Sequence, residues 1–118
     1  MVLIQVKAGS KGSWQFSNIS QFCHITFDGE GQIVGKPMAC PVQRLAVVFV
    51  KVEEDGNDRF YILMWEKLRD LLIKHHKAYL KKHNGIRPRR ADSLHAGFHE
   101  EALLPYVDKW STIMKNLK

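Results

Sequence analysis

The sequence predicts an α/β fold in which a small mixed β-sheet is flanked by helices. Short runs rich in β-branched and aromatic residues, bounded by glycine, proline or acidic turns, predict strands. One long run with apolar residues every three to four positions predicts a helix. The 118 residues are 45% hydrophobic and 25% charged, which is typical of a globular chain, and they suffice for a single domain over residues 1–118.

The first predicted strand covers residues 1–7 and carries two polar side chains on one face. Its apolar and partly β-branched residues favour a buried strand, and the small residues 8–13 end it. Side chains alternate across a strand, so Gln5 and Lys7 are expected to project to the same side. A lysine on a buried strand is unfavourable unless it is paired or used chemically. The alternative is that Lys7 marks an edge strand that emerges into water.

Residues 13–34 predict short elements. Residues 13–16 fit a short strand or a loop, and Ser17 or Asn18 can cap a brief helical turn. Asp28-Gly29 lies between two apolar runs, residues 25–27 and 32–34, and this arrangement is a strong hairpin signal.

Two longer apolar runs predict the main strands of the sheet. Residues 44–52 are almost continuously apolar, which favours a central strand buried on both faces. An acidic turn over residues 53–58 follows, and residues 60–65 then predict a second buried strand. The turn between them predicts antiparallel pairing of the two strands.

A helix is predicted from Glu66 to about Lys82. At 3.6 residues per turn, its apolar residues fall on one side and most of its lysines on the other. Asn84-Gly85 is a helix stop. His76 faces the apolar stripe and is expected to be a core or boundary residue rather than a ligand.

The C-terminal segment, residues 99–116, predicts a closing helix. Its apolar residues lie near one face, and Pro105 indicates a helix start or a kink. The chain has no internal repeat or linker, which favours one domain.

Composition also predicts the compartment. The longest apolar run, residues 45–50, is far too short to span a bilayer, and residues 1–7 lack the pattern of a signal peptide. Cys23 and Cys40 are too few for a disulfide framework and favour a reducing compartment. We therefore expect a cytoplasmic protein without a membrane partner.

Positive charge is concentrated in residues 66–90. The chain has a formal net charge of +6, and this segment holds essentially the whole excess. Arginines grouped around a proline suit phosphate geometry, so the segment predicts contact with nucleic acid. The alternative is a solvated helix face followed by a soluble loop. The candidate binding residues are Lys74, Lys77, Lys81, Lys82, Arg87, Arg89 and Arg90.

A resemblance to a known superfamily starts from the first strand. Ile4-Gln5-Val6-Lys7-Ala8-Gly9, followed by a loop and Trp14-Gln15-Phe16, resembles the second half of the PD-(D/E)XK nuclease-like signature, in its Gln-x-Lys variant. The superfamily includes restriction endonucleases and repair nucleases. The resemblance implies a shortened restriction endonuclease-like core, with DNA favoured over RNA as the partner.

The resemblance also implies a chemistry. If the protein is active, it is a metal-dependent endonuclease in which Mg²⁺ assists phosphodiester hydrolysis, with Lys7 at the attacking water and Gln5 near the metal. The family's metal-binding aspartate lies on an upstream strand. Only four residues precede Gln5 and none is acidic, so that aspartate cannot be mapped. A carboxylate would have to come from elsewhere in the chain or from another chain.

Three alternatives stay open. The first is a nuclease-like domain that binds nucleic acid, either as an active nuclease or as an inactive relative. The second is a non-catalytic interaction and assembly domain on the same scaffold. The third is that Met1 lies inside a longer gene product. Without the aspartate strand, the edge of residues 2–7 would need cover from the hairpin or from a second copy, so we expect a homodimer.

Overall fold

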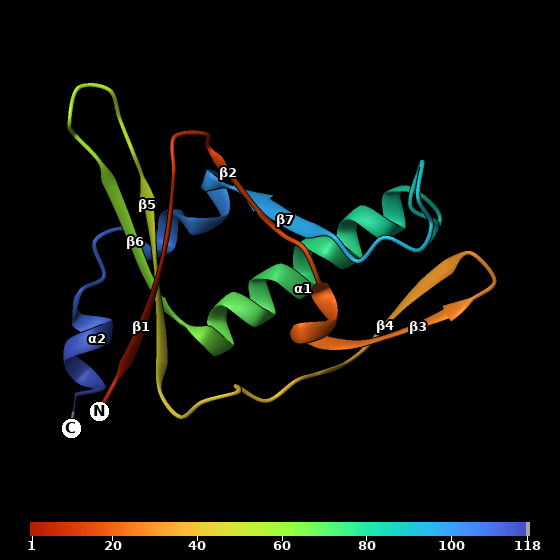
Figure 1. Cartoon of the computed structure of the whole chain (residues 1–118), viewed down its shortest axis with the longest axis horizontal. Helices are drawn as coiled ribbons and strands as arrows, with labels where there is room; N and C mark the ends of the chain where they lie inside the picture. Colours follow the sequence, from red (N-terminus) through yellow and green to blue (C-terminus); the bar gives the residue numbers. More distant parts are fainter. Residues whose placement is uncertain (118) are drawn as a thin grey trace. The chain divides into compact units, whose positions relative to one another are not determined.

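The computed structural model describes residues 1–117 and confirms the α/β class, with small sheets and a few helices (Figure 1). The chain forms two compact units. We call the first the sheet unit, comprising residues 1–14, 40–68 and 99–117. We call the second the helix unit, comprising residues 15–39 and 69–98. No helix in the described part of the chain is long and apolar enough to cross a membrane.

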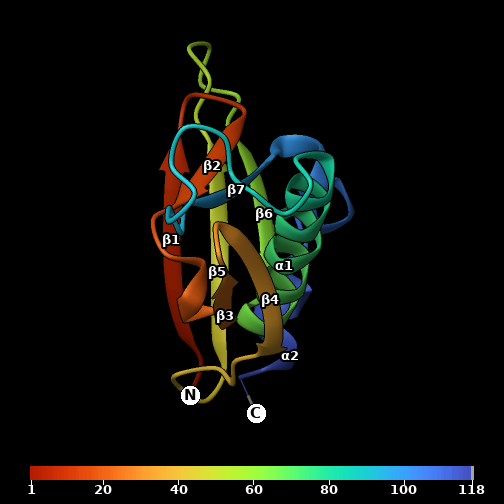
Figure 2. The ribbon, with the colours of Figure 1, turned by 90° about the vertical axis from the view of Figure 1, so that its right-hand side faces the viewer.

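The sheet unit is built on a mixed sheet in the order β1-β5-β6. β1 (Leu3–Gly9) runs parallel to β5 (Leu45–Lys51), and β6 (Arg59–Met64) runs antiparallel to β5. The predicted central strand is confirmed, since Ala46, Val47, Val48 and Phe49 are buried. The predicted antiparallel pair joined by the acidic turn is confirmed by the pairing of β5 with β6. Figure 2 shows β5 between β1 and β6.

The prediction that the first strand is buried is wrong. Leu3, Ile4 and Val6 are 42%, 51% and 61% exposed. Among residues 1–117, β5 is the only strand paired with β1, so β1 lies at the edge of the sheet. An apolar composition indicates a strand, whereas its burial depends on which strands lie beside it.

The predicted closing helix over residues 99–116 is also wrong. The segment consists of strand β7 (Ala96–His99), a 3₁₀ helix η2 (Glu100–Tyr106) and a short helix α2 (Ser111–Lys115), and β7 pairs with β2 (Ser13–Phe16). Between the two helices, Val107 bridges to Tyr61 of β6, and Asp108 adopts a φ of 51°. Backbone pairing with β6 thus replaces helical hydrogen bonds in this segment.

The helix unit combines a hairpin with most of the long helix. β3 (Cys23–Asp28) and β4 (Gly31–Pro37) form the predicted hairpin, with a φ of 61° at Gly29. The predicted cap is also present, because the Asn18 side chain accepts a hydrogen bond from the Ser20 amide at the start of η1 (Ile19–Gln21).

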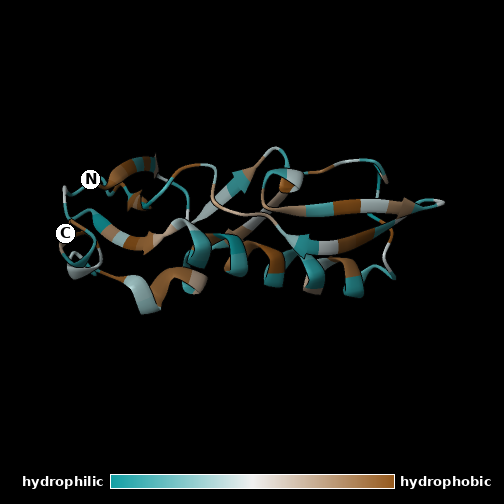
Figure 3. Ribbon diagram, turned by 90° about the horizontal axis from the view of Figure 1, so that it is seen from below, coloured by the Kyte–Doolittle hydropathy of each residue, from teal (hydrophilic) through white to brown (hydrophobic). Residues whose placement is uncertain are grey.

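The long helix α1 (Trp65–Lys82) is present as predicted. It ends where Asn84 and Gly85 take φ values of 56° and 82°, and the Gly85 N–H donates to the Leu80 carbonyl at 2.7 Å. Hydrophilic and hydrophobic colours alternate along it in Figure 3, as expected for a helix with one apolar and one charged side.

Candidate functional site

Gln5 and Lys7 share one face of the mixed sheet. They lie two residues apart on β1, in register with Val47 and Phe49 of β5. Gln5 is exposed and Lys7 is half-buried. Phe49 is in turn in register with Tyr61 of β6. Lys7, Phe49 and Tyr61 therefore form a row across this face.

Trp14 covers part of the same face. Its ring meets Phe49 edge-on, with the ring centroids 5.2 Å apart. The indole Nε1 lies 3.9 Å from the position that a Cβ on Gly9 would occupy. Within residues 1–117 this buried N–H has no hydrogen-bond partner. Sequence reasoning included Trp14 in the nuclease-like pattern but assigned it no role.

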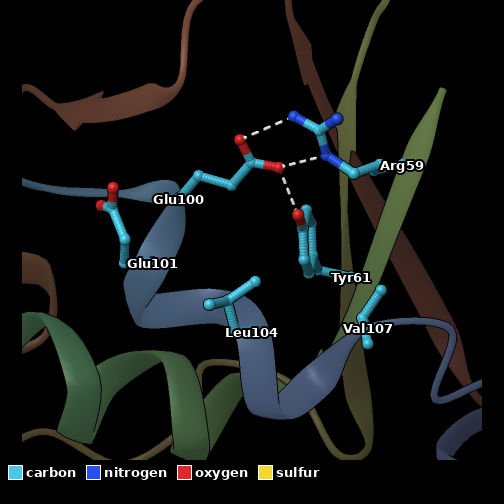
Figure 4. Close-up of a pocket in the computed structure, with 6 residues that line it drawn as sticks. All are labelled: Arg59, Tyr61, Glu100, Glu101, Leu104 and Val107. Carbon is cyan, nitrogen blue, oxygen red and sulfur yellow. Dashed lines mark hydrogen bonds and ion pairs between the residues drawn. The ribbon is translucent and has the colours of Figure 1, made fainter.

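One carboxylate reaches this face from the C-terminal segment. Glu100 accepts hydrogen bonds from Arg59 Nε at 2.7 Å and Nη2 at 3.0 Å, and also from the Tyr61 hydroxyl (Figure 4). The hydrogen bond to Arg59 holds the pKa of Glu100 below its usual range, whereas burial and the bond to Glu100 raise the pKa of Tyr61. Both Glu100 oxygens are therefore already committed to protein donors.

These three residues line a shallow pocket of about 300 Å³ with Glu101, Leu104 and Val107 (Figure 4). Sequence reasoning missed this group. Arg59 and Tyr61 carried a weak signal, since alternate residues of a strand share a face. Glu100 carried none, because it lies 41 residues beyond Arg59 and was expected inside a helix.

The donors on the Gln5–Lys7 face do not fit Mg²⁺ by themselves. Mg²⁺ favours carboxylates and water, and an amide oxygen such as that of Gln5 is a weaker ligand. Among residues 1–117, no group of three or more His, Cys, Asp or Glu side chains could hold a metal ion. A metal at Gln5 would need a carboxylate released from another contact or supplied by another molecule.

The lysines predicted to contact nucleic acid lie on the part of α1 that belongs to the helix unit. Lys74, Lys77, Lys81 and Lys82 are all exposed. The helix unit contains nine basic and four acidic residues, a net charge of +5. The sheet unit contains eight basic and eight acidic residues, so the excess positive charge of residues 1–117 lies in the helix unit.

A loop of three arginines follows this helix and is held at both ends by one residue. We call residues 85–93 the arginine loop. The Gln32 amide N–H donates to the Gly85 carbonyl at 2.8 Å, and the Gln32 side-chain Nε2 donates to the Ser93 carbonyl at 2.9 Å. Gln32 is only 5% exposed. Gln32 of the hairpin thus holds both ends of the arginine loop, and this limits the positions that the arginines of the loop can reach.

The same amide binds the buried histidine. Because Gln32 Nε2 donates to Ser93, its Oε1 faces His76 and accepts from Nε2–H of that ring at 2.6 Å. His76 is 2% exposed, as predicted for a core residue. Burial, with a smaller effect of Arg87, lowers its pKa from 6.5 to about 4.

This shift predicts a pH dependence of stability. Between about pH 6.5 and pH 4 the unfolded chain takes up a proton at His76 that the folded protein does not bind, so the free energy of unfolding falls as the pH is lowered, by about 3 kcal/mol in total. Stability from this group is complete above about pH 6.5. Denaturant unfolding at several pH values measures the decrease. In His76→Gln the decrease should be smaller by about 3 kcal/mol, because the group that takes up the proton is gone. Equal decreases in the two proteins would contradict this explanation.

Six of the seven predicted binding residues are exposed, and Arg87 differs from the rest. Its Nη1 donates to the His95 carbonyl, its guanidinium lies 5.3 Å from the centre of the Tyr79 ring, and its Nε is buried. Arg89 and Arg90 are exposed, and the Arg90–Asp92 ion pair is 3.5 Å long with both side chains 77% exposed. Arg87 thus helps to hold the arginine loop, while Arg89 and Arg90 face solvent.

The chain matches no protein-family model, no curated protein and no solved structure.

Proposed function

We propose that this protein is a nucleic-acid-binding domain that binds DNA through the basic surface, which we define as Lys74, Lys77, Lys81, Lys82, Arg89 and Arg90. The observation that carries the proposal is that these exposed cations all belong to the helix unit, where the lysines lie on α1 and the two arginines lie in a loop held by a buried glutamine. The nuclease-like pattern of the first strand supports DNA over RNA. The lack of a disulfide between Cys23 and Cys40 supports a cytoplasmic site of action.

Repulsion within the helix favours an anionic partner. Lys74 and Lys77 are three residues apart and Lys77 and Lys81 are four apart, so neighbouring side chains carry like charges. The acidic residue nearest them on this side, Asp70, already pairs with Arg69 at 2.9 Å. Phosphates would relieve this repulsion. The lysines extend about 12 Å along the helix axis, similar to the width of the DNA major groove.

The salt dependence of binding tests the proposal. The wild-type protein should bind a DNA duplex with an affinity that falls steeply as salt rises, because lysine and arginine contacts release counterions from phosphates. Replacing Arg89 and Arg90 together by glutamine should reduce the slope of log K against log salt by about 1.8. Fluorescence anisotropy over a salt series measures both quantities. Absence of salt-sensitive binding to either DNA or RNA would refute the proposal, and tighter binding to an RNA duplex of equal length would change the assigned partner.

Cleavage is the second part of the proposal and depends on a missing carboxylate. The resemblance assigns Lys7 to the attacking water and Gln5 to Mg²⁺, yet Glu100, which reaches the same face, is bound by Arg59 and Tyr61. We therefore expect the isolated protein to cleave DNA poorly or not at all with Mg²⁺. The alternative function, a non-catalytic assembly domain, shares this expectation but predicts no salt-sensitive DNA binding.

Lys7→Ala separates the two outcomes of a cleavage assay. Strong Mg²⁺-dependent cleavage that survives Lys7→Ala would remove Gln5 and Lys7 from the mechanism. Strong cleavage that Lys7→Ala abolishes would instead show that the protein supplies the missing acid. Lys11→Ala, in the loop after β1, is the matched control for loss of one positive charge near this face.

A further inference from the structure

One edge of β1 is open. Within residues 1–117, β5 is the only strand paired with β1. The hydrogen bonds at the two ends of the β1–β5 pair show which backbone groups of β1 face β5. The Leu3 N–H donates to the Arg44 carbonyl at 3.0 Å, and the Gly9 carbonyl accepts from the Val52 N–H at 2.9 Å. In a parallel ladder alternate residues face the same neighbour. The N–H and C=O groups of the intervening residues Ile4, Val6 and Ala8 therefore point to the open edge.

This edge lacks the features that usually prevent association. The register with β5 runs from Leu3 to Gly9 without a bulge, and β1 contains no proline. Ile4 and Val6, whose backbone groups face outward, are 51% and 61% exposed. The charged residue of the strand, Lys7, projects to the opposite face from them. The hairpin β3–β4 forms a separate two-stranded sheet and adds no strand here. A regular apolar edge is a template for another strand.

We propose that a second copy of this chain pairs with it through β1, antiparallel and about a twofold axis at Gln5. Ile4 then lies opposite the partner's Val6, and Val6 opposite the partner's Ile4, as hydrogen-bonded pairs. Two three-stranded sheets become one six-stranded sheet, which removes both open edges. The proposal is independent of nucleic-acid binding, because the basic surface belongs to the helix unit.

Side-chain chemistry favours this register over the neighbouring one centred on Val6. A twofold axis normal to the sheet keeps equivalent faces of the two copies on the same side. Directly opposite residues must then be an even number of positions apart in the sequence, so one residue of β1 lies opposite its own copy at the axis. An axis at Val6 would place Ile4 opposite the partner's Ala8 and Gln5 opposite the partner's Lys7. An axis at Gln5 instead makes two pairs of large branched side chains and places Lys7 opposite the partner's Leu3, away from the partner's Lys7.

The dimer would bring together the two faces that carry Gln5 and Lys7. The two Gln5 side chains meet at the axis, and the two Lys7 Cα atoms lie roughly 14 Å apart, from a strand rise of about 3.3 Å per residue and a strand spacing of about 4.8 Å. Neither residue opposite Gln5 or Lys7 is acidic. This dimer therefore adds a second amide to the face but does not supply the missing carboxylate.

Cysteine cross-linking tests the register. In a Cys40→Ser background, Gln5→Cys places two thiols at a non-hydrogen-bonded pair, with Cα atoms about 4.5 Å apart, within the range of a disulfide. Mild oxidation should then convert the 13.6 kDa chain into a covalent dimer of twice that mass. Lys7→Cys in the same background is the matched control and should cross-link poorly. Equal cross-linking of the two variants, or preferential cross-linking of Val6→Cys, would overturn the Gln5-centred register.

Solution mass tests the interface without oxidation. Sedimentation at micromolar concentration should give a dimer for the wild type and a monomer for Val6→Lys, with the far-ultraviolet circular dichroism unchanged because Val6 is exposed in the single chain. A monomeric wild type would refute the interface. Salt-sensitive DNA binding that persists in that case would leave the proposed function intact, so the two proposals fail separately.

Discussion

Glutamine at positions 74, 77, 81 and 82 is expected to weaken DNA binding by up to about a thousandfold at 0.1 M salt. Each lysine that neutralises one phosphate contributes about 0.9 to the slope of log K against log salt, so losing four contacts removes about 3.6. The four lysines are exposed and, within residues 1–117, form no ion pair with an acidic side chain, so the substitutions should leave the fold unchanged. Titrations of a labelled duplex at several salt concentrations measure the change in slope.

The sheet unit offers a control with the same change in charge. Lys11, Lys67, Lys109 and Lys115 are also exposed and belong to that unit. Their joint replacement by glutamine should leave the slope close to that of the wild type. If the two quadruple variants lose affinity equally, net charge rather than the basic surface drives binding, and the assigned interface is wrong.

Gln32→Leu is expected to lower the free energy of unfolding by about 3 to 4 kcal/mol. Leucine removes the acceptor of the buried His76 Nε2–H and the donor to the half-buried Ser93 carbonyl. A buried polar group left without a partner costs about 1 to 3 kcal/mol, and a half-buried one costs less. The backbone bond from residue 32 to Gly85 does not involve the side chain and should remain. Denaturant unfolding followed by circular dichroism measures the loss.

This substitution should also affect function through the arginine loop. With the Ser93 end released, Arg89 and Arg90 would sample more positions, so DNA affinity should fall even under conditions in which the variant is fully folded. Gln21→Leu, an exposed glutamine of the same unit, is the control and should change stability by no more than about 0.5 kcal/mol. If Gln21→Leu loses as much affinity as Gln32→Leu, DNA binding does not depend on how the arginine loop is held.

Local patterns predicted the elements whose boundaries depend on nearby residues. The long helix and its Asn84-Gly85 end, the Asp28-Gly29 hairpin and the Asn18 cap are each specified within a few positions of the chain, and the structure contains all of them. The buried central strand was also predicted, because a continuous apolar run is stable only with both faces covered. The concentration of basic charge could also be predicted, because most of the basic residues are close together in the sequence, on one helix and the loop after it.

The candidate site depends on contacts between residues far apart in the chain. Sequence reasoning placed Gln5 and Lys7 on one face and left a buried strand and an edge strand as alternatives, and the strand order decides for the edge. The hydrogen bonds of Glu100 with Arg59 and of Gln32 with His76 join residues 41 and 44 positions apart. Arg87 has the same side chain as its neighbours Arg89 and Arg90, and its contacts with Tyr79 and with the His95 carbonyl distinguish its role.

The sequence by itself determined the main strands, the long helix and its end, the hairpin and the location of the positive charge, because propensity, capping and side-chain periodicity act over a few residues. Only the tertiary structure decided that β1 is an exposed edge, that residues 99–116 divide into separate elements on either side of a bridge from Val107 to Tyr61, and that Glu100 is bound by Arg59 and Tyr61. The physical reason is that strand neighbours and buried polar partners come from distant parts of the chain, and their hydrogen bonds outweigh local helix preference.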